Sequence, residues 1–413
     1  MFVKEKQVVM SSGLKTSFFY LISIILLYNI KLFGMSISLN RIVLYTFFIQ
    51  YIFFYYKMSI PSVFYKVWIL SLSLIVYYLV IQFYNRSFDM TILLFVIEAF
   101  FIFPIGIYAF VKTFFDKINK IGIEQYLLNI LLLQSISILL MLFCPTLKSI
   151  TLQFVDSGVP FDKYPFRHVG LTGFTAYNMG VFLNLSLILF FSIYVNEKKL
   201  KITNLLGLLV ILLASLLTSR TGIIVIGISI ILLSMLKHKK IKKLFKILVM
   251  IFFILLFIGL TLFHLYPHKF AFLLWSFDIF ISLTRGENVQ GIDVIKNFYW
   301  EPNFKTFLIG DGLYSGKDGA YYMHTDAGYM RLILLFGFIG SFFFYFLYCV
   351  TFFYNFLFVK KYNFYLSIIY LIIIFSSFVI QYKGNIFLDG NELIKIMYLI
   401  FFYYYIQKEI KSV

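Results

Sequence analysis

The chain has 413 residues, of which 62% are hydrophobic and 13% charged, and its mean hydropathy is +0.92. These values exclude a soluble globular domain, because too few polar side chains are available to cover its surface. Apolar runs of about 20 residues instead predict an all-α polytopic membrane protein, with residues 1–413 forming a single integral-membrane domain.

The apolar runs predict about twelve transmembrane helices. The first run follows a short basic segment and ends without a small-residue cleavage site, so we expect a retained span rather than a signal peptide. In chain order, the runs fall near 17–34, 41–56, 62–84, 90–112, 121–144, 176–196, 202–218, 221–236, 244–264, 327–359, 362–382 and 389–407.

The positions of the lysines predict the orientation. With the N-terminus inside, the inner segments hold 21 of the 36 basic residues but only four of the 18 acidic residues. Such a bias is typical of a multi-pass protein of the plasma membrane with both termini in the cytoplasm. The net charge of +18 therefore indicates topology and not a nucleic-acid partner. Two large loops, about 145–176 and 266–326, are predicted on the outer face.

A turn formed by Ser219, Arg220, Thr221 and Gly222 joins the predicted helices 202–218 and 221–236. Their apolar lengths correspond to roughly 22–26 Å, less than the hydrocarbon thickness of about 30 Å. We therefore expect the turn below the outer surface, where Arg220 would face a wet cavity or an anion. The alternative is an arginine whose side chain extends to the interface.

The first outer loop combines basic, aromatic and glycine residues. This composition suits a surface that binds sugar or phosphate, because one arginine can donate two parallel hydrogen bonds to phosphate oxygens. A folded cap with aromatic interface anchors is an equal alternative. The residues concerned are Lys163, Tyr164, Arg167, His168, Gly170, Gly173, Tyr177 and Asn178.

The second outer loop contains an apolar stretch, 270–283, which we expect to lie as a helix at the membrane interface, directly before Arg285. The loop ends in a polar segment, from Gly310 to Asp326, that leads into an unbroken apolar helix. Histidine is the residue type most often used as a general base or acid, which suits His324 to that role, although a solvated loop histidine is the alternative. Asp326 lies beside it.

Four ionisable residues fall in or near the predicted spans, and such residues usually face a cavity or one another. They are Glu98, Glu124, Arg331 and Lys395. No nucleotide-binding fingerprint and no convincing metal-ligand pattern is present, so neither a cofactor nor a metal is predicted.

Two stretches resemble the Wzy-type O-antigen and capsule polysaccharide polymerases and the related O-antigen ligases. The first, LLASLLTSRTGIIVIGISIILL (212–233), resembles the Ser-Arg turn of that family. The second, FLIGDGLYSGKDGAYYMHTDAGYMRLILLFGFIG (307–340), resembles its glycine-rich block ahead of a helix. The predicted topology is also similar. The paired RX10G loop signature of some polymerases is absent, because Asn178 and Lys296 stand eleven residues after Arg167 and Arg285.

The resemblance implies metal-independent inverting glycosyl transfer on the outer face, with a donor glycan carried on undecaprenyl diphosphate and no cofactor. It implies that Arg220 and Arg285 hold the diphosphate, with Arg167, Tyr329 and Arg331 as further substrate contacts. It gives the role of base to His324, with Asp326 as the substitute. The other partners it implies are membrane lipids and a chain-length regulator protein. An O-antigen ligase and, in another class, a lipid-linked oligosaccharide flippase are the alternatives.

Overall fold

The structure is a computed structural model, which describes ten ranges of the chain and isolated residues between them. The ranges are 12–28, 30–32, 37–55, 60–154, 176–197, 201–219, 221–236, 296–316, 320–389 and 391–412. Over these residues the chain forms helices and no strand, as predicted. Among the described residues, six helices are long and apolar enough to cross a membrane, which supports a multi-pass membrane protein. The count of twelve spans and the choice of the plasma membrane stay predictions.

The first part of the chain follows the predicted apolar runs closely. Its elements are α1 (Ser12–Leu27), α2 (Leu39–Gln50), the π-helix η1 (Tyr51–Tyr55), α3 (Ser62–Asn85), α4 (Thr91–Ile97), the π-helix η2 (Glu98–Ile102), α5 (Phe103–Ile121) and α6 (Ile123–Phe143). Elements α4, η2 and α5 follow one another without a loop and together form a candidate span, Thr91–Ile121.

The second part contains the long helices that support the candidate site. Its elements are α7 (Pro145–Phe154), α8 (Ala176–Asn184), α9 (Ser186–Asn196), α10 (Ile202–Thr218), α11 (Thr221–Ser234), α15 (Phe304–Ile309), the 3-10 helix η3 (Tyr322–His324), α16 (Gly328–Lys360), α17 (Phe364–Gln381), α18 (Ile386–Asp389) and α19 (Asn391–Ser412). The interfacial helix predicted at 270–283 and most of the run at 244–264 lie outside the described residues.

The π-helix η2 has a cause in the sequence. Pro104 has no backbone N–H, so it cannot donate to the carbonyl of Phe100 as a helical residue would. The indole Nε1–H of Trp68, on α3, donates to that carbonyl instead, at 2.8 Å. A wide turn at this point is a common response of a helix to a missing hydrogen bond.

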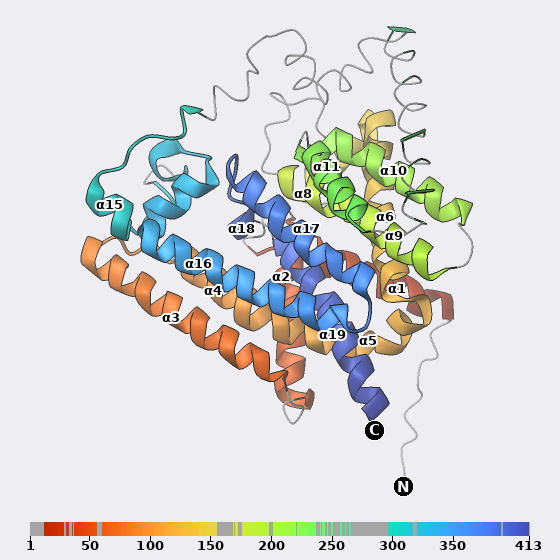
Figure 1. The fold of residues 1–413 in the computed structure, drawn as a ribbon, viewed down its shortest axis with the longest axis horizontal. Coiled ribbons are helices and arrows are strands. Elements are labelled where there is room, and N and C mark those ends of the chain that lie inside the picture. The colour runs from red at the N-terminus through yellow and green to blue at the C-terminus, as the bar shows by residue number, and fades with distance from the viewer. Residues whose placement is uncertain are drawn as a thin grey trace.

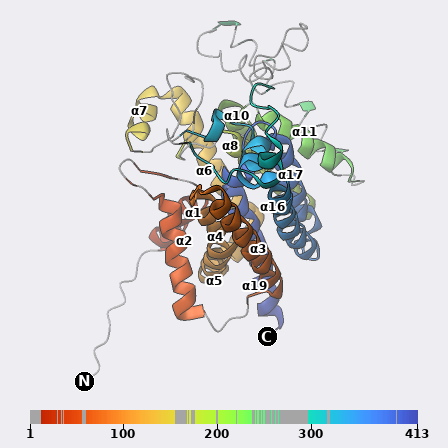
Figure 2. The ribbon, with the colours of Figure 1, turned by 90° about the vertical axis from the view of Figure 1, so that its left-hand side faces the viewer.

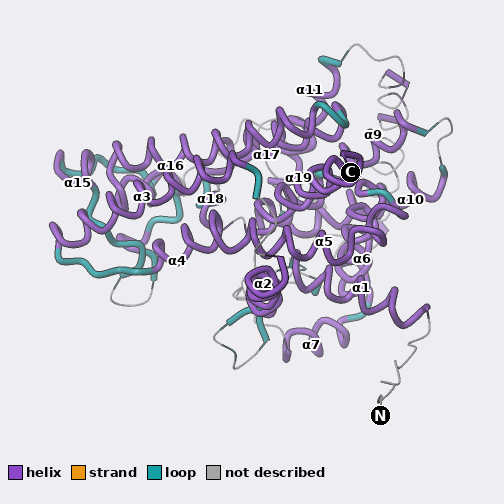
Figure 3. The backbone as a smooth tube through the Cα atoms, turned by 90° about the horizontal axis from the view of Figure 1, so that it is seen from below, coloured by secondary structure: helices purple, strands orange, loops and turns teal. Residues whose placement is uncertain are grey.

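Two arrangements organise the fold. Helices α3 and α16 pack side by side, with α15 at one end of the pair (Figures 1 and 3). The stretch Asn178–Asn196, made of α8 and α9, is the most enclosed of the six candidate spans. Of its most apolar 18 residues, 89% are buried. Helix α8 contacts α10, α11, α17 and α19. Figure 2 shows α7 beyond the end of α6, away from α16 and α17.

Helix α16 is not the unbroken helix that the sequence predicts. At Gly337 the backbone takes φ 67° and ψ −178°, which interrupts the helix nine residues after it begins. Glycine adopts this region at little cost, whereas other residues rarely do. The prediction was wrong because a glycine inside an apolar run is also compatible with a regular membrane helix. The interruption is the place where the preceding polar segment docks.

Candidate functional site at the first turns of helix α16

The polar segment before α16 packs into the break of that helix. We call its described residues, 310–316 and 320–324, the docked loop. The backbone N–H of Asp311 donates to the Leu334 carbonyl at 2.6 Å, and that of Gly312 donates to the Leu335 carbonyl at 3.2 Å. The break at Gly337 makes these carbonyls available to the loop. Non-helical backbone at membrane depth requires such internal hydrogen bonds, because lipid offers none.

Helix α3 holds the loop from the other side with polar residues near its C-terminal end. Gln82 Nε2 donates to the Gly312 carbonyl, and Asn85 Nδ2 donates to the Gly310 carbonyl at 2.9 Å. The two side chains lie on the same face because they are three residues apart in a helix. The glycine carbonyls are thereby fixed from α3 while neighbouring amides are fixed from α16.

Asp89, just after α3, contributes a third anchor. Its Oδ2 accepts hydrogen bonds from the backbone N–H groups of Tyr314 at 2.8 Å and Ser315 at 3.1 Å, and Oδ1 accepts from that of Thr91 at 3.0 Å. Burial raises the pKa of the Asp89 carboxyl, but the hydrogen bonds outweigh burial and leave its pKa below the ordinary value. Asp89 therefore holds the loop as a carboxylate.

Asp311 accepts hydrogen bonds from another residue of the docked loop and from α15. Thr306 Oγ1 donates to Asp311 Oδ1 at 2.7 Å, and the Tyr322 hydroxyl donates to Oδ2 at 3.3 Å. Burial, together with this carboxylate, raises the pKa of Tyr322. The Asn303 side chain caps α15 by accepting from the Thr306 N–H at 2.8 Å. The loop is thus fixed internally as well as to both helices.

Arg331 joins the loop to the first turns of α16. Its side chain is 4% exposed, and its Cζ atom lies 3.5 Å from the ring centroid of Tyr321 and 4.1 Å from that of Tyr314. A planar guanidinium stacks well on aromatic faces, which suits this position between two tyrosines. The stacking stabilises the loop, and contact between Arg331 and a substrate stays a prediction.

His324 and Asp326 are both exposed, next to the start of α16. Buried Thr325 holds the segment between them, because its Oγ1 donates to the Phe298 carbonyl at 3.0 Å. Met323 and His324 have φ values of 56° and 53°. The left-handed region costs a methionine about 1–3 kcal/mol, and such backbone strain is often found at functional sites. The loop thus presents both predicted proton acceptors to solvent in a defined backbone conformation.

Tyr329 contacts helix α17. Its hydroxyl donates to the Phe378 carbonyl at 2.7 Å, and its ring centroid lies 5.9 Å from that of Tyr345. Beside it, Gly328 lies so close to Gln381 that an added Cβ would meet that side chain at 2.6 Å. These contacts orient the start of α16, and a substrate contact for Tyr329 stays a prediction.

The turn between α10 and α11 packs against α8. Asn184 Nδ2 donates to the Gly180 carbonyl at 2.6 Å, to Ser215 Oγ at 2.8 Å and to the Gly222 carbonyl at 3.0 Å. Ser219 is 6% exposed. The turn is therefore packed within the protein, and its depth in the membrane stays a prediction. Arg220 itself lies outside the described residues, as do Arg167 and Arg285. Their proximity to His324 stays a prediction.

In the predicted first outer loop, His168 is buried. Burial, and to a lesser extent the nearby Lys148, lowers the pKa of His168 to about 4. Its imidazole is therefore neutral at neutral pH. Gly170 and Leu171 lie against α6, where Gln134 Oε1 accepts the Leu171 N–H at 3.1 Å. These contacts favour the folded-cap interpretation for this part of the loop.

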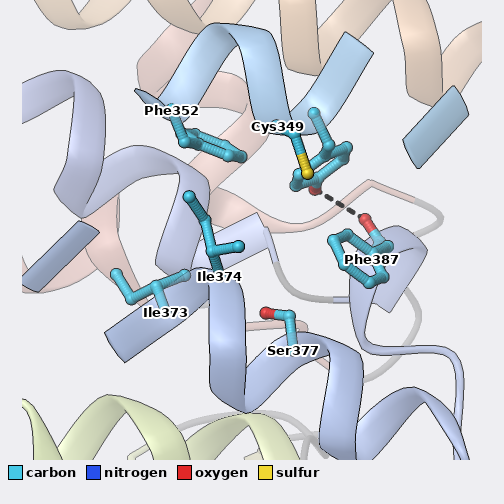
Figure 4. Close-up of a pocket in the computed structure, with 7 residues that line it drawn as sticks. Cys349, Phe352, Ile373, Ile374, Ser377 and Phe387 are labelled. Carbon is cyan, nitrogen blue, oxygen red and sulfur yellow. Dashed lines mark hydrogen bonds between the residues drawn. The ribbon is translucent and has the colours of Figure 1, made fainter. Parts of the chain in front are cut away.

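A small pocket lies between α16, α17 and α18 (Figure 4). Its cavity volume is about 10 Å³, about the space of one water molecule, and the Tyr348 hydroxyl beside it donates to the Phe387 carbonyl at 2.7 Å. The lining residues are Tyr348, Cys349, Phe352, Ile373, Ile374, Ser377 and Phe387. Small-molecule sites usually enclose at least about 300 Å³ and carry convergent polar groups. The pocket is a gap in helix packing and lies about three turns beyond Gly337 on α16.

Comparison of the chain with protein-family models, with curated proteins and with solved structures gives no match in any of the three. The family resemblance therefore depends on the two sequence stretches and the predicted topology.

Proposed function

We propose that the protein polymerises oligosaccharide repeat units, carried on undecaprenyl diphosphate, into an O-antigen or capsule polysaccharide on the outer face of the plasma membrane. The docked loop carries the proposal. It is fixed to α3 and α16 from both sides, and it holds His324 and Asp326 exposed at the start of a long apolar helix. A reactive group at this position suits a substrate whose lipid part stays in the bilayer.

The chemistry requires few groups. His324 or Asp326 takes the proton of the acceptor hydroxyl, and the resulting oxygen attacks the anomeric carbon of the donor glycan. The bond between that carbon and the diphosphate oxygen breaks, and undecaprenyl diphosphate leaves with the electron pair. Arg220 and Arg285 are proposed to stabilise the charge that develops on the diphosphate. Because the donor already carries an activated leaving group, a separate nucleotide is not required.

The docked loop also supports the proposal through its rigidity. A base must stay within hydrogen-bond reach of the acceptor hydroxyl while the donor is aligned, and a misplacement of about 1 Å can cost two orders of magnitude in rate. Gln82 and Asn85, on α3, donate hydrogen bonds to the loop, and Asp89, just after α3, accepts from it, so residues more than 200 positions earlier in the chain supply this positioning. We therefore assign these three residues to positioning and not to contact with substrate.

The experiment is deletion of the gene in its native host, followed by complementation with variants and electrophoresis of the surface glycans. For a polymerase, deletion leaves single capped repeats, whereas loss of a ligase leaves no attached repeats. We expect His324→Ala or Asp326→Asn to shorten the glycan severely, because loss of a general base slows transfer by about 10²- to 10⁴-fold. Arg220→Ala should do the same.

Glu301→Gln is the matched control, since Glu301 is an exposed acidic residue of the same outer segment. It should leave a full ladder of chain lengths. Normal polymer length from both His324→Ala and Asp326→Asn, at unchanged protein levels in the membrane, would rule out the proposed mechanism.

A further inference from the structure

A second group of ionisable side chains lies inside the helix bundle, apart from the docked loop. It comprises Arg41 on α2, Glu98 at the start of η2, and Glu392 and Lys395 on α19. Lys395 is 0% exposed, Glu392 1% and Glu98 4%, whereas the Arg41 side chain is 38% exposed. Ionisable residues are costly at such positions and usually have a function there.

Arg41 and Glu98 form a fixed pair. Arg41 Nη2 lies 2.8 Å from Glu98 Oε2 and its Nε lies 3.1 Å from the same oxygen. The Tyr45 hydroxyl donates to the other carboxylate oxygen, Oε1, at 2.5 Å. Arginine stays protonated in proteins, so Arg41 keeps its positive charge beside the Glu98 side chain.

Lys395 has a different environment. Its Nζ atom finds no hydrogen-bond acceptor among the described residues, and the ring centroid of Phe103 lies 5.7 Å away. Three charged groups act on it: Glu392, one helical turn earlier on α19, Glu98 of η2 and Arg41 of α2. An ammonium group has three donors, and burying them without acceptors is unfavourable. The buried amine therefore has donors without acceptors among the described residues.

We propose that Lys395 and Glu392 form a proton-binding site within the membrane-spanning helices. The pair holds one proton either as ammonium and carboxylate or as amine and carboxylic acid. Uptake of one further proton from water leaves the Lys395 ammonium beside a neutral Glu392 carboxylic acid. The net charge of the site rises by one, and two cations, Lys395 and Arg41, then share the single carboxylate of Glu98.

This excess of positive charge has a mechanical consequence. Repulsion between Lys395 and Arg41 competes with the bond that holds Arg41 to Glu98, the first residue of η2. Proton uptake therefore shifts η2 relative to α19. The proposal concerns the helix bundle and does not depend on polymerase activity.

The chain contains a natural reporter of η2. The Trp68 indole donates to the Phe100 carbonyl of η2 at 2.8 Å, and its ring stacks on Phe101 with centroids 5.8 Å apart. The other tryptophans of the chain are Trp275 and Trp300. Replacing these two by phenylalanine leaves Trp68 as the single tryptophan, so the tryptophan fluorescence then comes from Trp68 only.

The test uses the full chain with Trp275→Phe and Trp300→Phe, reconstituted in lipid nanodiscs. Trp68 emission is recorded from about pH 5 to about pH 9, the interval in which buried lysines and carboxyls titrate. We expect one reversible transition. Glu392→Gln or Lys395→Met should abolish it or move its midpoint by at least about one pH unit, which corresponds to a tenfold change in proton affinity. Lys408→Met, an exposed lysine on the same helix, should leave it unchanged.

The double variant Glu392→Gln/Lys395→Met removes one charge of each sign, so it tests the site without leaving an unbalanced buried charge. Size-exclusion chromatography shows whether each variant is folded. If the double variant is not folded, the test uses Glu392→Gln alone, because glutamine has nearly the same shape as glutamate. Absence of a transition in the parent, or an unchanged midpoint in these variants, would overturn the proposal.

Discussion

Replacement of Gly337 by alanine tests whether the break in α16 holds the docked loop. An added Cβ would lie 2.2 Å from the Leu308 carbonyl oxygen and 2.4 Å from the Ile309 backbone nitrogen. Because both are backbone atoms at the end of α15, that end of α15 and the docked loop that follows it must move. The left-handed conformation costs alanine about 1–2 kcal/mol, the overpacking about 1–3 kcal/mol, and the two lost backbone hydrogen bonds about 1 kcal/mol each. Together these terms destabilise docking by about 4–7 kcal/mol.

Hydrogen–deuterium exchange of the full-length protein measures this effect at the Asp311 and Gly312 amides. At 1.4 kcal/mol per factor of ten, the destabilisation corresponds to exchange faster by about 10³- to 10⁵-fold. The control is Gly227→Ala on α11, where an added Cβ meets nothing within 4 Å. That substitution should be neutral or stabilising by up to about 1 kcal/mol. Equal exchange of the loop in Gly337→Ala and the parent would refute the role assigned to the break.

Three further predictions concern single side chains. Asp89 has a lowered pKa in the folded protein, so its stabilisation of the loop is complete above about pH 4 and is lost as pH falls through its folded pKa. Asp89→Asn should remove that acid sensitivity, measured as exchange of the Tyr314 and Ser315 amides at decreasing pH. Asn184→Ala loses three buried hydrogen bonds, so it should lower the free energy of unfolding by about 2–4 kcal/mol. The measurement is the melting temperature in detergent, which should fall. An unchanged melting temperature would contradict the packing described for α8. Arg331→Lys should destabilise docking of the loop by about 1–3 kcal/mol, because an ammonium cannot stack on two rings. The measurement is the rate of tryptic cleavage after Lys317, which should rise.

The apolar runs predicted much of the fold because lipid requires helical backbone and excludes charge. Helices α3, α6, α10 and α17 begin and end within a few residues of the predicted runs. The break at Gly337 could not be predicted in this way. Its cause is the docking of Gly310 and Asp311, some 25 residues earlier in the chain, and hydropathy contains no information on such a contact.

The candidate site was predicted in part. The sequence singled out the polar segment, His324, Asp326 and the nearby Arg331, because these residues are unusual beside an apolar helix. It did not indicate Gln82, Asn85 and Asp89, which hold the loop in place. Their spacing of three and four residues at the end of a span was a usable signal. Polar residues are also common where a helix leaves the membrane, so that signal does not by itself identify a binding surface.

The hydrogen bonds between α3 and the docked loop have a consequence for biogenesis. Asn85 and its partner Gly310 are separated by 225 residues. At about 5–20 residues per second, a ribosome needs roughly 10–50 s to make the intervening chain. During that interval the amides and carboxylate at the end of α3 have no loop to bind, although α3 itself is already made. The site therefore assembles only after nearly three quarters of the protein has been synthesised, and a chain that stops earlier leaves these polar groups for membrane quality control to recognise.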